Sequence, residues 1–477
     1  MNISPGTINA AEAKTYDLAV IGAGSAGFSA AIGAAELGAQ VALIGHGTIG
    51  GTCVNIGCVP SKTLIRAADA LHASRAASRF DGIRGGATLD NWQSLLAQKD
   101  ELVATLRSSK YANLLSEYDA IHYLEGEANF TKEGVFVDGN LLRSPRTIIA
   151  TGAAPTIPSI PGLESVRYLT STEALELSTL PTSLVVIGAG YIGLELAQMF
   201  RRFGVEVTVV CRSRLLPAAE PEISQALEAY LVDEGIRVVK GVSYRRAEAT
   251  SDGARLIVET EGDEMALEGQ HLLVATGRQP NSANLGLDAA EIRVGENGGI
   301  IVDEHLQTSN PNTYAVGDVT GRDMYVYMAA YGGRRAAENA LNDAGHRYDS
   351  RAMPAVTFTD PQVASVGLTE RTAKDLGHPV KTTVLPMDAV PRALAARDTR
   401  GLVKLVANSE TDILLGAHIL APEAGDSIQT AAVAIAQNMT AKALSEMIFP
   451  YLTSVESLKL AAQTFEKDIS KLSCCAG

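Results

Sequence analysis

Residues 17–27 read DLAVIGAGSAG, a short apolar run that ends in a glycine-rich turn. The run predicts a buried strand, the Ala-rich segment after it predicts a helix, and the apolar residues 40–44 predict a second strand. Gly22, Gly24 and Gly27 would permit a tight turn, close approach of a pyrophosphate and close packing of helix on strand. Placed between a strand and a helix, this pattern predicts a dinucleotide site at the helix N-terminus and argues against a structural turn alone.

The same order of features returns over residues 183–210, with Gly188 standing 166 positions after Gly22. The second loop carries Gly188, Gly190 and Gly193, again after an apolar run and before a predicted helix. Two strand–turn–helix–strand units in one chain predict an α/β protein that binds two dinucleotides.

The residues about 20 positions after each loop indicate which ribose is bound. After the second loop stand Arg212 and Arg214 with no carboxylate, which favours the 2′-phosphate of NADPH over NADH. Two solvated surface arginines are the alternative. After the first loop, Gly45 and His46 stand where an Asp or Glu is expected. What binds that ribose stays open, with backbone groups and His46 as candidates.

Two similar phrases, residues 147–152 and 272–278, bracket the second unit. Each predicts a buried strand that runs into a glycine turn, so we expect the second unit to be inserted into the first domain. A predicted hairpin and an Ala-rich helix near the C-terminus indicate a third, α+β domain. The predicted parts are a flexible tail (1–15), a first domain (16–152 and 278–350), an inserted domain (153–277) and a C-terminal domain (351–477).

The bulk composition excludes several classes of protein. The 477 residues carry a net charge of −14, which disfavours nucleic-acid binding, since that requires a basic surface. No apolar run reaches the roughly 20 residues that span a bilayer, and residues 1–16 lack the basic start and apolar core of a signal peptide. We therefore predict a cytoplasmic protein. Five cysteines at irregular spacing are no secreted disulfide framework.

Residues 50–62 read GGTCVNIGCVPSK and contain a reactive cysteine pair. Cys53 and Cys58 could close a small disulfide loop, and Pro60 suits a first helical turn, which places Cys58 at a helix start. The helix dipole and Lys62 would favour the thiolate there. A structural or metal-only pair is the alternative, but it explains neither the adjoining glycines nor the dinucleotide folds.

This segment and the first glycine loop together resemble the pyridine nucleotide–disulfide oxidoreductases, and the resemblance extends from Tyr16 to the C-terminus. Residues 308–318 resemble the family's second FAD motif, in which Asp318 would bind the ribityl chain. The resemblance implies two Rossmann-like dinucleotide-binding domains, for FAD and NADPH, and an α+β C-terminal dimerisation domain. It also implies a homodimer whose active sites are shared between subunits.

The family's chemistry implies roles for particular residues. NADPH would reduce FAD, and FAD would reduce the disulfide of Cys53 and Cys58, with Cys58 nearer the flavin and Cys53 as the interchange thiol. Lys62 would lie near the flavin, paired with Glu195. Cys211 is expected to be a buried strand residue. The implied cofactor contacts are Gly22, Gly24, Gly27, Gly51, Thr52, Lys62, Thr151, Gly152 and Asp318 for FAD, and Gly188, Gly190, Gly193, Arg212, Arg214 and Gly277 for NADPH.

A substitution near the C-terminus indicates the branch of the family. Relatives that reduce disulfides carry a histidine followed by a glutamate, whereas here Tyr451 takes the histidine's place and Glu456 is kept. No histidine follows His418. Because a tyrosine has an unperturbed pKa of about 10, it is a poor proton shuttle at neutral pH. This argues against a dithiol or disulfide substrate.

The last five residues read SCCAG, so Cys474 and Cys475 are vicinal thiols close to the chain's end. Thiolates select soft metals and can pass them on by ligand exchange. An incidental exposed tail or an incomplete zinc clip is the alternative. Together with Tyr451, and with Tyr191 in the second glycine loop, the tail resembles that of the mercuric reductases, one branch of the family.

That resemblance implies a route for the metal. Hg(II) would arrive as a thiol complex, be captured by Cys474 and Cys475 of one subunit, move to Cys53 and Cys58 of the other, and leave as Hg(0). A dihydrolipoamide dehydrogenase-like disulfide reductase, a flavin oxidase or quinone reductase, and a non-enzymatic metal-sequestering protein are the competing interpretations.

Overall fold

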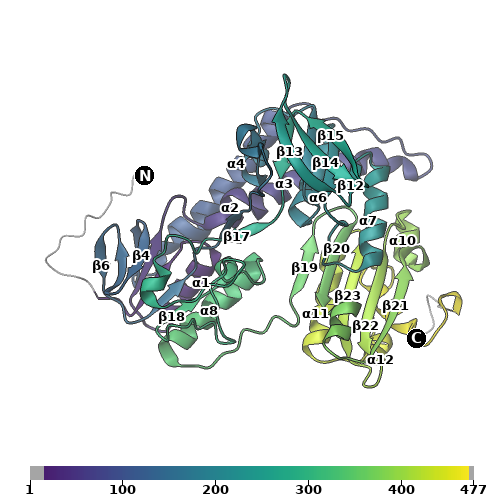
Figure 1. Ribbon diagram of the computed structural model, residues 1–477. Coiled ribbons are helices and arrows are strands. Elements are labelled where there is room, and N and C mark those ends of the chain that lie inside the picture. The colour runs from purple at the N-terminus through teal and green to yellow at the C-terminus, as the bar shows by residue number, and fades with distance from the viewer. Residues whose placement is uncertain (1–14, 472–477) are drawn as a thin grey trace. The chain divides into compact units, whose positions relative to one another are not determined.

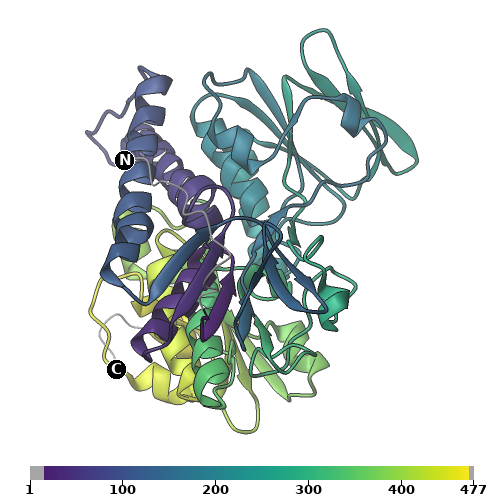
Figure 2. The same cartoon turned by 90° about the vertical axis from the view of Figure 1, so that its left-hand side faces the viewer.

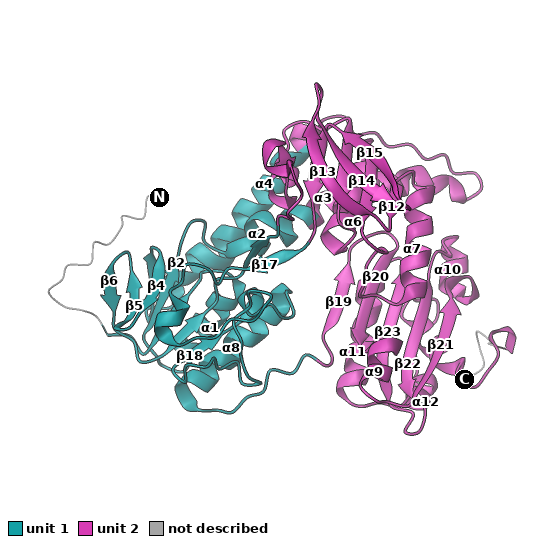
Figure 3. Ribbon diagram, viewed as in Figure 1, with its two compact units in different colours: residues 1–61, 95–156, 277–350 teal, residues 62–94, 157–276, 351–477 magenta. Residues whose placement is uncertain are grey.

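The computed structural model describes residues 15–471 (Figure 1). The predicted tail lies almost entirely outside the described residues, as do Cys474 and Cys475. The chain divides into two compact units (Figure 3). Unit 1 takes the residues up to Ser61, then 95–156 and 277–350; unit 2 takes 62–94, 157–276 and the chain from Arg351 onward.

Unit 1 is built on a five-stranded parallel sheet in the order β18-β7-β1-β2-β3. Its central strands are fully buried, as the apolar run predicts, and β1 and β2 run side by side, in purple in Figure 2. The strands are β1 (Leu18–Ile21), β2 (Val41–Gly45), β3 (Ile121–Glu125), β7 (Thr147–Ile149) and β18 (Thr313–Ala315).

Helices α1 (Ser25–Glu36) and α8 (Val326–Asn342) pack against each other over this sheet. Small residues allow the close approach: a Cβ on Gly333 would lie 2.3 Å from the Ala26 carbonyl oxygen. Unit 1 also contains α2 (Gly51–Ile56), α4 (Trp92–Arg107, largely), a three-stranded antiparallel sheet and a strand pair; the strands are β4 (Ala128–Thr131), β5 (Gly134–Val137), β6 (Asn140–Leu142), β8 (Ala153–Pro155) and β17 (Arg278–Pro280). Helix α3 (Cys58–Arg75) begins in unit 1 and continues into unit 2.

Unit 2 contains the second parallel sheet, in the order β12-β11-β10-β16-β9. A three-stranded antiparallel sheet accompanies it, as one does in unit 1. The elements are α5 (Ser171–Leu175), α6 (Tyr191–Arg202), α7 (Pro221–Asp233), β9 (Tyr168–Leu169), β10 (Ser183–Ile187), β11 (Glu206–Cys211), β12 (Arg237–Lys240), β13 (Ser243–Ala249), β14 (Ala254–Thr260), β15 (Asp263–Gly269) and β16 (His271–Val274).

The C-terminal part of unit 2 is a five-stranded antiparallel sheet in the order β19-β20-β23-β22-β21. The predicted hairpin is its β22–β23 pair, and the predicted Ala-rich helix is α11, which packs on the sheet. The elements are β19 (Pro354–Thr357), β20 (Gln362–Gly367), β21 (Val380–Pro386), β22 (Leu402–Asn408), β23 (Leu414–Ala421), α9 (Glu370–Asp375), α10 (Pro391–Ala396), α11 (Ala424–Ala436), α12 (Ala441–Glu446) and α13 (Glu456–Gln463).

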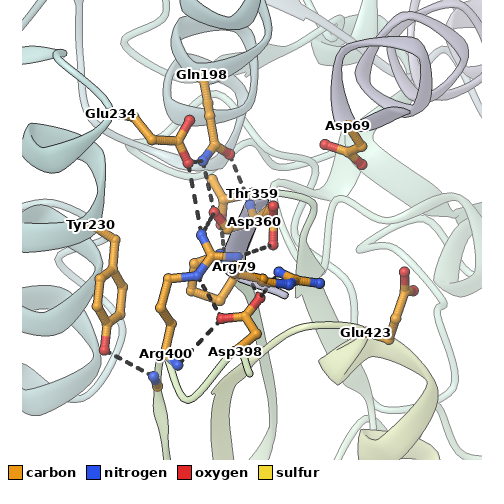
Figure 4. A network of polar contacts seen from close by, with 12 residues as sticks. Asp69, Arg79, Gln198, Tyr230, Glu234, Thr359, Asp360, Asp398, Arg400 and Glu423 are labelled. Carbon is orange, nitrogen blue, oxygen red and sulfur yellow. Dashed lines mark hydrogen bonds and ion pairs between the residues drawn. The ribbon is translucent and has the colours of Figure 1, made fainter. Parts of the chain in front are cut away.

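A buried network of charges connects α6 to the C-terminal part of unit 2. The Arg202 side chain is only 2% exposed, and its guanidinium donates to Asp69 at 2.7 Å, to Glu234 at 2.7 Å and to Asp360 at 2.8 Å. Figure 4 shows the surrounding contacts, in which Arg400 binds Asp360 and the Gln198 amide joins Glu234. Burial and then neighbouring Asp360 raise the pKa of Asp69 to about 6, although Arg202 opposes this. These groups tie the second parallel fold to the antiparallel sheet.

The predicted fold class is confirmed: two Rossmann-like folds with parallel sheets, and a C-terminal domain of antiparallel strands and helices. The boundaries of the three predicted domains stay a prediction, because the contacts group the second fold and the C-terminal domain into one unit. Within residues 15–471, no helix is long and apolar enough to cross a membrane.

Candidate active site

The first glycine loop is held by backbone contacts that exclude any side chain. Gly22 has φ +116°, and a Cβ there would lie 2.2 Å from the Ala150 carbonyl oxygen. A Cβ on Gly27 would lie 1.8 Å from the Gly22 carbonyl oxygen. Gly24 is the N-cap of α1 and offers no side-chain hydrogen bond, which leaves the first-turn N–H groups available to a phosphate. The loop has the shape that a dinucleotide requires.

Two further glycines bring the cysteine segment against this loop. Gly51 has φ +67°, and a Cβ there would lie 2.7 Å from the Gly24 Cα. The Gly50 N–H donates to the Ala23 carbonyl at 2.9 Å. Thr52 follows on α2 and is exposed. The cysteine segment, residues 50–62, is therefore anchored directly on the predicted FAD loop.

The cysteine pair spans the junction of two helices. Cys53 lies in α2 and is half-buried, whereas Cys58 is the first residue of α3 and is exposed. Gly57 lies between the two helices. Only glycine fits there without a shift, because a Cβ would lie 2.9 Å from the Thr52 carbonyl oxygen. The predicted helix start at Cys58 is confirmed, and thiolates are stabilised at such a position.

Asn55, which lies between the two cysteines, holds the start of α2. Its side-chain amide donates to the carbonyls of Ile49 at 2.9 Å and Gly51 at 2.8 Å. Arg107 in turn donates to the Asn55 side-chain oxygen at 3.2 Å. The roles of Asn55 and Gly57 were not predicted from the sequence; the available signal was their position inside the five-residue spacing between the cysteines.

Lys62 and Glu195 form an ion pair of 2.6 Å, the pairing that the family resemblance implies. Lys62 lies one helical turn after Cys58 on α3, so the two side chains share a helix face. Glu195 is 3% exposed, and its other oxygen accepts from the Phe358 N–H at 2.9 Å. The Phe358 ring lies 5.0 Å from the Lys62 ammonium. Glu195 is thus a fixed, buried anion that holds the lysine in place.

The second FAD motif lies in unit 1 after β18. Asp318 sits in a short helix, residues 317–320, and burial raises its pKa despite Arg278, whose guanidinium is 3.9 Å away. The Thr151 hydroxyl donates to the Asn281 carbonyl at 2.7 Å. Gly152 and Gly277 both have positive φ, +72° and +123°, so both make the predicted turns.

The second glycine loop repeats the first in unit 2. A Cβ on Gly188 would lie 2.4 Å from the Ala275 carbonyl oxygen, and one on Gly193 would lie 2.4 Å from the Gly188 carbonyl oxygen. A Cβ on Gly190 would meet nothing within 4 Å, so this loop is open at its mouth. Tyr191 is the first residue of α6 and is half-buried.

The two predicted phosphate-binding arginines differ in their surroundings. Arg212 is exposed, directly after the last residue of β11. Arg214 instead donates to the backbone carbonyls of Pro217 at 2.9 Å and Ala219 at 2.7 Å, so part of its guanidinium holds a turn. Cys211 is buried at the end of β11, as predicted. Both arginines stay candidates for a 2′-phosphate, because Arg212 is exposed and the Arg214 Nη1 atom is buried without a hydrogen-bond partner among the described residues.

The C-terminal candidates lie around the start of α13. Tyr451 is 53% exposed, in a turn that also exposes Ile448 by 97%. Glu456 is 7% exposed, and its Oε2 atom is buried without a hydrogen-bond partner among the described residues. An exposed apolar turn beside a buried carboxylate is suited to burial against another subunit.

Comparison with known proteins defines the family. Residues 16–344 match the family described as pyridine nucleotide-disulphide oxidoreductase, and residues 353–462 match the dimerisation domain of the same family. The chain belongs to the pyridine nucleotide-disulphide oxidoreductases. As a member of this family, it is an oxidoreductase that uses FAD and NADPH, and it carries the dimerisation domain.

Individual relatives narrow the resemblance. Mercuric reductase of Lysinibacillus sphaericus is 49% identical over 464 residues, which cover 97% of this chain and 85% of that protein. Mercuric reductase of Streptomyces lividans is 46% identical over 468 residues, covering 97% and 98%. Among solved structures of the oxidoreductases, the Cu(II) complex of the HOCl-induced flavoprotein disulfide reductase RclA from Escherichia coli is 30% identical, with a TM-score of 0.83 and coverage of 95% and 100%.

The residues present fit both cofactors of the family. In unit 1, the first-turn N–H groups of α1 without a side-chain cap, the cysteine segment anchored on the loop and the partly buried Asp318 suit a tightly held FAD. In unit 2, the open Gly190 and the exposed Arg212 suit a nucleotide that binds and leaves.

Proposed function

We propose that this chain reduces Hg(II), delivered as a complex with two thiols, to Hg(0) with electrons from NADPH. The observation that carries the proposal is the similarity to mercuric reductases, which extends over 97% of this chain at 44–49% identity. Tyr451 in place of a basic histidine supports it, because metal exchange between thiolates needs no strong base.

The reaction balances without a further reactant. NADPH and one proton supply two electrons and two protons. Mercury takes the electrons, both of its bonds to sulfur break, and the two thiolates leave as thiols. When bound, FAD would supply the electron pair, taken from NADPH, to the metal held by the two cysteine thiolates, and the protein supplies position and charge.

The residues around the cysteine pair and the second FAD motif have distinct proposed tasks. Cys53 and Cys58 bind the metal as thiolates, and the helix start at Cys58 favours that charge state. Lys62, held by Glu195, places a positive charge one turn further along the same helix. Asp318 orients the ribityl chain of FAD.

The remaining proposed tasks fall on residues that other elements supply. Cys474 and Cys475 of one subunit capture the metal and pass it to the other subunit's pair, which makes the homodimer the active form. Tyr191 and Tyr451 line the route, and Glu456 supports Tyr451 from the start of α13. The exposed apolar turn around Ile448 suits such a shared interface.

Steady-state oxidation of NADPH tests the proposal. We expect turnover with Hg(II) in excess thiol and little or none with lipoamide or glutathione disulfide; Cu(II) in excess thiol is the matched metal comparison. Faster turnover with either disulfide would assign the chain to the disulfide reductases. Absence of NADPH oxidation with every acceptor would favour metal sequestration.

Replacing both tail cysteines tests the route. Cys474→Ala with Cys475→Ala should impair turnover of thiol-bound Hg(II) and leave the flavin absorbance unchanged, because the tail is proposed to act before electron transfer. A doubly substituted protein with normal turnover would remove the tail from the mechanism.

A further inference from the structure

The end of β2 lacks the carboxylate that this kind of fold uses for the adenosine ribose. In Rossmann units an Asp or Glu at the end of the second strand accepts hydrogen bonds from a ribose hydroxyl. Here the strand ends in Gly45, which follows Gly22 by the same number of positions, 23, by which Cys211 follows Gly188. Gly45 is therefore the equivalent position by both strand end and spacing.

The space beside Gly45 is filled by a tyrosine. A Cβ on Gly45 would lie 2.6 Å from the Tyr123 hydroxyl oxygen, 2.7 Å from its Cε2 atom and 2.8 Å from the Ala23 Cβ. Gly45 does not have a positive φ, so the backbone does not demand glycine there. The lack of space requires glycine at this position, because the Tyr123 ring occupies the place where an acidic side chain would begin.

The neighbouring strand places Tyr123. Tyr123 lies on β3 and pairs with Leu43 of β2, so its side chain shares a face of the sheet with Leu43 and Gly45. The ring is half-buried against the core of the first fold, and its hydroxyl lies beside Gly45 at the end of β2, where Ala23 of the glycine loop also approaches. This is the edge of the sheet at which a dinucleotide binds.

The Tyr123 hydroxyl is chemically suited to a ribose. It makes no hydrogen bond within the described part of the chain, although the ring around it is half-buried. Burial, followed by the nearby Glu125, raises its pKa, so the group stays neutral. A neutral phenol can donate one hydrogen bond and accept others, which matches ribose hydroxyls that both donate and accept.

His46, the other candidate at this strand end, is directed elsewhere. Its Nε2 atom lies 3.3 Å from Glu127, and both side chains are mostly exposed, at 70% and 78%. The Gly45 carbonyl is also engaged, since it accepts from the Gly126 N–H at 2.9 Å. His46 and the Gly45 carbonyl are thus engaged elsewhere, whereas the Tyr123 hydroxyl stands directly beside the Gly45 α-carbon.

We infer that the Tyr123 hydroxyl hydrogen-bonds the adenosine ribose of FAD and replaces the absent carboxylate. The inference depends on the family's use of FAD and not on the identity of the electron acceptor. A failure of mercury reduction and a failure of this contact are therefore separate results.

The test measures how tightly the full-length protein rebinds FAD after its own flavin has been removed. Flavin fluorescence reports the binding. The ligands are FAD and its analogues lacking the 2′- or the 3′-hydroxyl of the adenosine ribose. The wild type should bind at least one analogue about three- to tenfold more weakly than FAD, the value of one neutral hydrogen bond. Tyr123→Phe should weaken the binding of FAD by a similar factor. This variant should also bind FAD and that analogue equally well.

Tyr118→Phe is the matched control, because Tyr118 packs on the same core at the other end of β3 and should leave affinity unchanged. Equal binding of all three ligands by the wild type would overturn the inference, as would full affinity in Tyr123→Phe.

A second pair of variants keeps the test independent of the phenylalanine substitution. Gly45→Glu alone should lose FAD affinity, because its side chain collides with the Tyr123 ring. Gly45→Glu combined with Tyr123→Val should bind FAD more tightly than Gly45→Glu alone, because the ring no longer blocks the carboxylate, although the close approach to the Ala23 Cβ remains. If the single variant binds FAD as well as the wild type does, the ring does not occupy the acid's place and the inference fails.

Discussion

The two dinucleotide folds of this chain are nearly identical in their loops and different at their strand ends. The first glycine of each loop would place a Cβ 2.2 Å or 2.4 Å from a carbonyl oxygen of the neighbouring strand's turn. At the strand ends, however, Gly45 is packed against the Tyr123 side chain, whereas Cys211 is followed by the exposed Arg212. Backbone sterics thus fix the shape that accepts a pyrophosphate, and a few side chains at the strand end select the nucleotide.

The mouths of the two loops differ as well. Gly51 crosses the first loop, where its α-carbon approaches Gly24, whereas nothing lies within 4 Å of a Cβ on Gly190 in the second. A covered loop suits a cofactor that stays bound, and an open one suits a cofactor that is exchanged in every turnover.

The largest effect is expected from Gly51→Ala. A Cβ there would strike the Gly24 α-carbon at a positive φ, so the variant should lose FAD and activity together. The measurement is the flavin absorbance of the purified protein. Gly190→Ala is the control: it should keep its flavin and melting temperature and raise only the KM for NADPH. A flavin-loaded, active Gly51→Ala protein would contradict the account of the covered loop.

The last residues of the two loop helices provide the next contrast. Arg202 on α6 is buried among three carboxylates, and Arg202→Ala should lower the free energy of unfolding by about 3–5 kcal/mol, because it leaves buried charges unpaired. Glu36 at the end of α1 instead pairs with the exposed Arg334, and Arg334→Ala should have no measurable effect. Denaturant unfolding compares the two variants. If Arg202→Ala lowers the free energy of unfolding no more than Arg334→Ala does, the Arg202 network does not anchor the second fold.

Arg212→Ala tests the strand end of the second fold. Loss of a charge-assisted contact of about 1.5–3 kcal/mol predicts a roughly 10- to 100-fold rise in the KM for NADPH. The KM for NADH should change little, so the preference between the two nucleotides narrows. Arg214→Ala should act mainly on stability, because that guanidinium holds the carbonyls of Pro217 and Ala219. An unchanged preference in Arg212→Ala would leave the 2′-phosphate without its proposed ligand.

The smallest effect is expected from Tyr244→Phe, beside the end of β11. The Tyr244 hydroxyl donates to the Val210 carbonyl at 3.3 Å, and burial raises its pKa to about 12. Removing this bond should cost about 1 kcal/mol of stability and leave the KM for NADPH unchanged. Tyr123→Phe, whose hydroxyl has no such protein partner, should change ligand affinity instead. A changed KM in Tyr244→Phe would mean that both tyrosines contact nucleotides.

Much of the fold could be predicted from the sequence because glycine spacing and apolar runs are local signals. The helix start at Cys58, the buried strands before each loop and the β22–β23 hairpin all follow from such runs. The two antiparallel three-stranded sheets did not stand out, because β4, β5 and β6 are short and the edge strands β13 and β15 of the other sheet are largely polar and exposed.

The site was predictable where a motif lies in consecutive residues, and not where contacts come from distant strands. The Lys62–Glu195 pair joins residues 133 positions apart and could be expected only from the family resemblance. Tyr123 lies 78 positions after Gly45, and no local pattern connects them. Arg214 shows the converse: its place in the sequence suggests a phosphate ligand, and its contacts with backbone carbonyls are visible only in three dimensions.

Simultaneous measurement of NADPH oxidation and of mercury vapour released from Hg(II) in excess thiol tests the proposed reaction most directly. One Hg(0) should leave for every NADPH oxidised, and Cys58→Ser should abolish the release while retaining FAD. If NADPH is consumed without mercury vapour, or if vapour still forms at the wild-type rate in Cys58→Ser, the metal is not reduced at the cysteine pair.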